Sequence, residues 1–159
     1  MHGAVGRGCN RLLATGPAGF SGMASAPVVT ALQRSPLLTR IARAISAAGL
    51  TSRLNAAKAI TVFAPDDPAF IALGRGNLTT LLASKSDLAK VVQFHVVIGR
   101  LTPADLASGR HITTFLGTVI VPAKLHGKYR VNNAQVVCGN IQTANATVYI
   151  VNKVLVPIP

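Results

Sequence analysis

The stretch that decides the fold is residues 61–70, which read TVFAPDDPAF. Residues 59–64 alternate between two sides and predict a β-strand, which Pro65 ends because proline cannot donate to a strand ladder. The residues on one side of this strand are Ile60, Val62 and Ala64, and those on the other are Thr61 and Phe63. A polar turn after the strand leads directly into a short helix that includes Phe70.

Asp66 and Asp67 stand at the start of that helix, where a carboxylate oxygen can accept hydrogen bonds from the first backbone N–H groups. We therefore interpret this pair as helix caps. The alternative is a catalytic acid/base pair. Composition restricts it, since the chain has no glutamate and only two other aspartates, Asp87 and Asp105.

Three further segments carry helix signals. Ser35 can cap a helix that begins at Pro36 and stops at Gly49. A helix over residues 84–94 starts with a capping serine and has an aspartate at the capping-box position. Thr102, followed by proline, repeats the capping pattern and predicts a short helical turn.

His95 lies at the end of the apolar stripe of the helix over residues 84–94. Its simplest interpretation is a buried histidine that hydrogen-bonds its neighbours, and the alternative is a ligand or base. An enzyme would need a pocket that holds His95, His111 or His126 beside an aspartate or serine. The chain carries no nucleophile-elbow, zinc-protease or phosphate-loop motif. We therefore expect no catalysis, no metal and no cofactor.

The second half of the chain changes to short β-strands separated by glycine and asparagine turns. Helices followed by strands are typical of an α+β fold. We expect an exposed hairpin tip at residues 124–128. The predicted strands cover residues 112–116, 118–121, 129–132, 135–138, 147–151 and 153–156.

The chain is strongly basic, with sixteen Lys and Arg against four Asp and a formal net charge of +12. Such charge attracts polyanions without sequence specificity. The densest basic patch consists of Lys124, Lys128 and Arg130, with His126 between them. The patch is either a solvated surface or a polyanion site. No nucleic-acid-binding signature accompanies it, so we expect no specific nucleic-acid partner.

The two cysteines, Cys9 and Cys138, cannot form a zinc site alone and lack a redox spacing. From the residues alone, they are either free and buried or paired. The N-terminus shows no secretory signal, and we interpret the chain as a mature protein whose export signal is absent. No stretch approaches the roughly 20 apolar residues of a membrane span.

At this point the sequence resembles a fasciclin domain, through four blocks in the family's order. The blocks are residues 61–70, 92–97, 113–117 and 141–157. The second contains Phe94 and His95, which stand at the Tyr-His pair of the family's central motif. The resemblance implies a β-sandwich-like core of short strands flanked by several short helices, with a domain over residues 35–159 and an N-terminal extension, residues 1–34, packed on it.

Residues before the first block and near the end also resemble the secreted or surface-anchored immunogenic fasciclin proteins of mycobacteria and other actinobacteria. That resemblance implies a disulfide between Cys9 and Cys138, a secreted or cell-surface location, and adhesion without catalysis. The expected partners are host or matrix surface proteins, or acidic glycans and envelope polymers that meet the basic surface. We expect a monomer. The alternative function is binding of an apolar small molecule, a carotenoid or a lipid.

Two departures from the family pattern bear on partners. Phe94 replaces the tyrosine of the central pair, so a contact that depends on that hydroxyl is lost. Asn152 and Lys153 stand where acids are common in the family, and the acidic adhesion motifs have no clear counterpart. Integrin-type recognition is therefore not expected.

Overall fold

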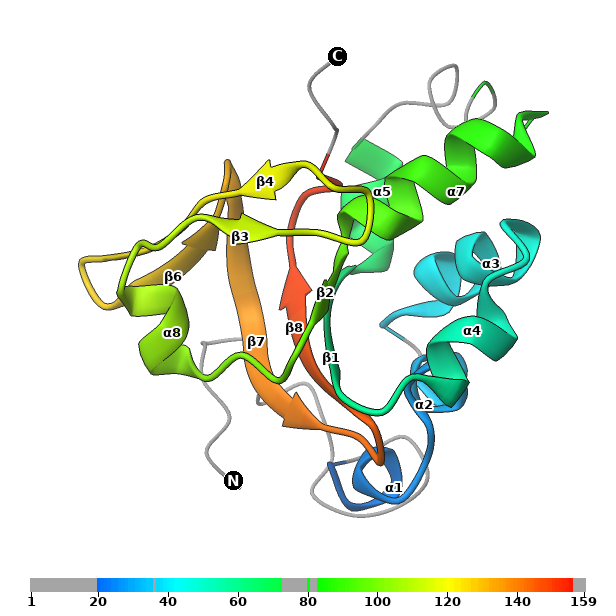
Figure 1. Ribbon diagram of the computed structural model, residues 1–159, viewed down its shortest axis with the longest axis horizontal. Helices are drawn as coiled ribbons and strands as arrows, with labels where there is room; N and C mark the ends of the chain where they lie inside the picture. Colours follow the sequence, from blue (N-terminus) through cyan, green and yellow to red (C-terminus); the bar gives the residue numbers. More distant parts are fainter. Residues whose placement is uncertain (1–19, 36, 73–79, 81–82, 156–159) are drawn as a thin grey trace.

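The computed structural model describes residues 20–35, 37–72, 80 and 83–155. The described helices are α1 (Phe20–Ala24), α2 (Val28–Arg34), α3 (Thr39–Ala47), α4 (Thr51–Ala56), α5 (Asp67–Ala72), α7 (Lys85–Phe94) and α8 (Pro103–Ala107). The described strands are β1 (Ile60–Pro65), β2 (Val96–Ile98), β3 (Ile112–Thr113), β4 (Val119–Ile120), β5 (Pro122–Leu125), β6 (Lys128–Val131), β7 (Ala134–Gln142) and β8 (Ala146–Val151). All the described helices except α8 gather on one side of a curled sheet, and α8 lies on the other side, beside the short strands (Figure 1).

The described strands form a six-stranded sheet and a two-stranded one. The larger sheet runs in the order β2-β1-β8-β7-β6-β5, and the smaller one pairs β3 with β4. β1 and β8 lie parallel, with Phe63 opposite Tyr149, and the other neighbours pair in the antiparallel sense. The expected α+β class is confirmed.

The sheet separates two apolar cores, because the side chains of its central strands alternate between its faces. On β1, Val62 faces the helices α1–α4, α5 and α7, whereas Phe63 faces β3, β4 and α8. On β8, Val148 and Tyr149 divide in the same way. Every residue of β1 and β8 is buried, as expected for strands covered on both faces.

The N-terminal helices belong to the core on the helical face. Met23 of α1 and Val28 of α2 are fully buried in it, and the side chain of Asn145 accepts a hydrogen bond from the Val28 N–H at 2.9 Å. The Ala144 N–H also bonds the Ala26 carbonyl at 2.8 Å. Residues 20–34 therefore pack on the same layer as the helices that follow them.

Several sequence predictions about element boundaries are confirmed. β1 ends at Pro65. The Ser84 hydroxyl caps α7 by accepting from the Asp87 N–H, and Thr102 and Asp105 form a reciprocal capping box at α8. Gly49 follows α3 with a φ of +75°, the left-handed conformation that commonly ends helices.

Three predictions about secondary structure are wrong. α3 begins at Thr39, and the Ser35 hydroxyl accepts from the Leu37 N–H in the turn after α2 instead of capping a helix. Residues 153–155 form no strand, because β8 already ends at Val151. Pro122–Leu125 was not expected to be a strand, yet it pairs with β6, and the hairpin tip shrinks to His126 and Gly127.

Candidate functional site

The two aspartates that follow β1 serve two different helices. Asp66 is buried, and its Oδ1 accepts from the Ala69 N–H at 2.9 Å, which caps α5. Asp67 reaches across to α3, where its Oδ2 accepts from the Thr39 hydroxyl at 2.6 Å and its Oδ1 from the Arg40 N–H at 2.9 Å. Both carboxylates hold backbone and hydroxyl donors of the scaffold, which supports the capping interpretation.

The other two aspartates also lie at helix starts. Asp105 accepts from the Thr102 N–H at 2.8 Å, and this backbone bond lowers the pKa of its carboxyl. Its Oδ1 lies 4.0 Å from Arg110. Asp87 is exposed in the first turn of α7, where a negative charge is favourable. Each acid therefore lies at the positive end of a helix.

His95 is buried between α7 and the C-terminal segment. Its Nδ1 lies 2.7 Å from the Val91 carbonyl, and its Nε2 lies 2.9 Å from the Leu155 N–H. The carbonyl requires a proton on Nδ1 and the N–H requires a lone pair on Nε2, so the geometry selects the neutral Nδ1–H tautomer. Burial lowers the pKa of His95 to about 4. Both nitrogens are occupied by backbone, and the ring serves as a structural link.

Phe94 and Tyr149 fill the core on the other face of the sheet. Phe94 is 2% exposed and packs near Phe63, which stacks on the Tyr149 ring at a centroid distance of 5.6 Å. The Tyr149 hydroxyl donates to the Leu101 carbonyl at 2.8 Å. The central motif of this chain is therefore core, with no exposed functional group at Phe94.

The basic hairpin, defined as Lys124, Lys128 and Arg130 on β5 and β6, divides its charges between two faces. Lys124 is opposite Tyr129 in the ladder, and its ammonium lies 5.2 Å from that ring centroid. Lys128 and Arg130 alternate with Tyr129, so they share the other face. All three cations are exposed. The patch expected from sequence is thus a two-sided cationic edge.

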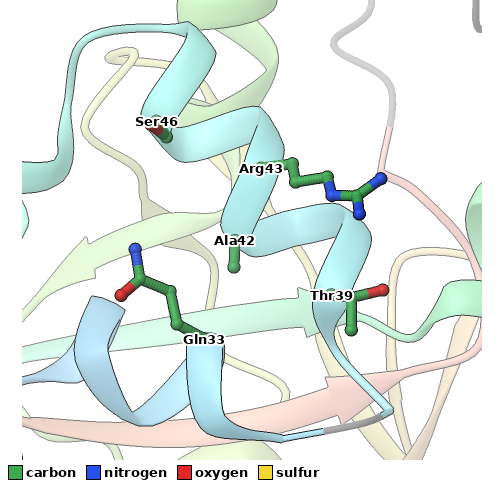
Figure 2. A pocket seen from close by; sticks show the side chains of 5 residues that line it. All are labelled: Gln33, Thr39, Ala42, Arg43 and Ser46. Atoms are coloured by element: carbon green, nitrogen blue, oxygen red, sulfur yellow. The ribbon is translucent and has the colours of Figure 1, made fainter.

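A shallow open pocket of about 340 Å³ lies between α2 and α3 (Figure 2). Its volume is at the lower end of the range for small-molecule sites. Thr39, Ala42, Arg43 and Ser46 lie along one side of α3 at helical spacing. Figure 2 shows the Gln33 amide on one side of Ala42, and the side chains of Arg43 and Thr39 on the other. Sequence reasoning missed this α2–α3 pocket because two helices must meet to form it.

Two polar residues that sequence reasoning did not single out organise the turn before β8. The Nδ2 of Asn145 donates to the carbonyls of Leu54, Asn55 and Ala57 at 2.8–3.2 Å. The guanidinium of Arg100 donates to three carbonyls at residues 143, 144 and 146, and to the Gln142 side chain. Both side chains stabilise the scaffold. In the sequence, Asn145 was recognisable only as a turn residue, and Arg100 carried no signal.

Cys138 lies on β7 and is 1% exposed. Cys9, its expected disulfide partner, lies outside the described residues. Within the described parts of the chain, no three His, Cys, Asp or Glu side chains gather as metal ligands, and no helix has the length and apolar character to cross a membrane.

Comparisons with known proteins agree with this geometry. The sequence profile of the fasciclin domain matches residues 36–157. The chain is 37% identical to the immunogenic protein MPB70 of Mycobacterium bovis, over 96% of this chain and 82% of that protein. It is 35% identical to the cell surface glycolipoprotein MPB83 of the same species, over 96% of this chain and 72% of that protein.

A solved structure supports the same fold. A FAS1 domain pair from the insect cell adhesion molecule fasciclin I superposes with a TM-score of 0.72 at 17% identity. The superposition covers 86% of this chain and 52% of that one, so this chain spans about half of the domain pair.

Proposed function

The chain belongs to the fasciclin domain family, and from that premise we propose that it is a non-catalytic interaction module of the bacterial cell surface or exterior. Its partners in this proposal are acidic glycans or acidic envelope polymers, contacted through the basic surface. The names of its relatives, a cell surface glycolipoprotein among them, support the location.

The observation that carries the proposal is the separation of acids from cations. All four aspartates lie at helix starts, and three of them accept hydrogen bonds from the scaffold. Within the described residues, one ion pair occurs, the exposed Arg110–Asp105 contact at 4.0 Å. The other exposed cations of the described residues form no ion pair with a described acid, so their field is available to an external polyanion.

The basic hairpin supplies the contact in this proposal. Its three cations lie on β5 and β6, at one edge of the sheet, and the sequence has no acid between residues 106 and 159. Asp105 of α8, which packs against both strands, is paired with Arg110. Leu125 beside them is 53% exposed, which adds an apolar contact surface. A cationic edge that presents charge on both faces suits a flexible chain better than a flat, rigid surface.

Retention on immobilised heparin and on neutral dextran tests the proposal. We expect retention on heparin that is lost as sodium chloride rises, and none on dextran, because exposed charges are screened by salt. Elution of the protein in the void volume of both columns at low salt would contradict the proposal that its partner is an acidic glycan.

The Cys9–Cys138 disulfide forms part of the same proposal. The described part of the chain holds no free cysteine, and α1 packs against β7, which carries Cys138. A bridge there would fasten residues 1–34 to residues 35–159 and suit an oxidising exterior. Thiol titration of the denatured, nonreduced monomer should find no free thiol, and two free thiols would contradict the bridge.

The α2–α3 pocket gives no support to the alternative of an apolar ligand. The pocket described between α2 and α3 is lined by an amide, two hydroxyls and a guanidinium around one alanine, which does not suit a carotenoid or a lipid tail.

A further inference from the structure

We propose that the α2–α3 pocket binds one carboxylated sugar residue of an acidic glycan. This inference rests on the proposed function and adds a defined site to it. The pocket lies in the helical layer, on the opposite side of the molecule from the basic hairpin (Figure 1).

The lining of the pocket combines one cation with several groups that can bond hydroxyls. Arg43 offers a planar guanidinium that can hold a carboxylate with two parallel bonds. Gln33 and Ser46 can each donate and accept. A ligand that matches this set carries one carboxylate and neighbouring hydroxyls, as a uronic acid does.

Thr39 adds a directional requirement. Its hydroxyl proton is already donated to Asp67 at 2.6 Å, so its oxygen can only accept. A ligand group at Thr39 must therefore be a donor, which a sugar hydroxyl is and a carboxylate is not. The Asp67 carboxylate behind Thr39 also repels an anion at this end. The carboxylate of the ligand is thus directed to Arg43, four residues further along α3.

Arg43, the cation that lines the pocket, is available to a ligand, and so are two other arginines of α2 and α3. Within the described residues, the side chains of Arg34, Arg40 and Arg43 form no hydrogen bond or ion pair, and all three are exposed. Ala42, 4% exposed, is the small side chain between Gln33 and Thr39 that leaves the space open (Figure 2). A bulkier residue there would fill the space that the sugar ring needs.

An NMR titration of the full chain with glucuronate tests the site. We expect saturable shifts at the Gln33 side-chain amide and the Arg43 Nε–H. Glucose and acetate, added separately at matched ionic strength, should each bind more weakly because each lacks half of the recognised groups. Arg43→Gln should weaken glucuronate binding by about tenfold or more, as loss of a charged hydrogen bond does. The control variant on the hairpin, Lys128→Gln/Arg130→Gln, should bind glucuronate as tightly as the wild type does.

If glucuronate causes no shifts at Gln33 and Arg43, the proposal that the pocket binds a carboxylated sugar is wrong. So would equal weakening by Arg43→Gln and by the hairpin control, which would indicate diffuse charge attraction. If heparin still retains the wild type in either case, the proposed function stands and this inference alone fails. If heparin does not retain the wild type, the proposed function fails on its own test.

Discussion

The carboxylate of Asp67, on α5, accepts a hydrogen bond at 2.9 Å from the backbone N–H of Arg40, in the first turn of α3. α3 has Leu38 at its N-cap position, which offers no side-chain oxygen. A residue 27 positions further along the chain therefore supplies the cap. This relationship ties the segment after β1 to the helix that forms one wall of the α2–α3 pocket.

Asp67→Ala should lower the free energy of unfolding by about 1 kcal/mol or somewhat more, because an N-cap and the Thr39 hydroxyl both lose their acceptor. Urea denaturation measures the difference. The matched control is Asp87→Ala, whose carboxylate bonds no described residue and which should cost a few tenths of a kcal/mol. Equal losses in the two variants would contradict the capping role across helices.

Sequence reasoning predicted the caps at Asp66, Ser84 and Thr102, but not the helix that Asp67 caps. Asp66 and Asp67 are adjacent, and local rules assign both to the helix that follows. Only tertiary packing brings α3 to Asp67, so no local pattern predicts that bond. Ser35 failed for the same reason: the structure caps α3 from a distance, which leaves the nearby serine to a turn.

The candidate site shows the same limit. The clustering of the three cations of the basic hairpin could be predicted from the sequence. Their division between two faces could not, because it depends on β5, whose proline and lysine weaken a strand signal. The α2–α3 pocket needs two helices in contact and carries no motif. His95 was predicted well, because an apolar stripe that ends in histidine already indicates burial.

Asn145→Ala should lower the free energy of unfolding by about 3 kcal/mol, since its amide joins α2, the end of α4 and the turn before β8. Thermal or urea unfolding gives the value. Asn133→Ala is the control, because Asn133 is exposed and bonds no described residue through its side chain. A loss below about 1 kcal/mol at Asn145 would show that the three segments hold together without it.

The stability of the protein should fall between pH 6.5 and pH 4 through His95. Burial lowers the folded-state pKa of His95 to about 4, although the bond to the Val91 carbonyl opposes this, while the unfolded chain titrates near 6.5. The unfolded state therefore binds the proton first. The contribution of the neutral ring is complete above pH 6.5 and is lost as the pH falls to about 4, a loss of about 3 kcal/mol.

Two measurements check this pH dependence. NMR should find the His95 imidazole still neutral at pH 5, while the exposed His111 serves as the internal comparison. Between pH 6.5 and 4.5, the free energy of unfolding of His95→Gln, measured in urea, should depend less on pH than that of the wild type. The free energy of unfolding of His111→Gln should depend on pH as that of the wild type does. An imidazolium at His95 in the folded protein at pH 6 would contradict the buried neutral link.

The central claim is that this fasciclin domain acts by offering localised positive charge to an acidic glycan. The direct test is the affinity for heparin across a series of salt concentrations, for the wild type and for two variants of equal net charge. One variant is Lys124→Gln/Lys128→Gln/Arg130→Gln, and the other is Lys58→Gln/Lys85→Gln/Lys90→Gln on exposed lysines of the helical side.

At about 1 kcal/mol per cation near a polyanionic surface, the hairpin variant should bind roughly a hundredfold more weakly, with a shallower salt dependence. The helical-side variant should retain most of the affinity of the wild type. Equal losses in both variants, or an affinity that does not change with salt, would contradict the account.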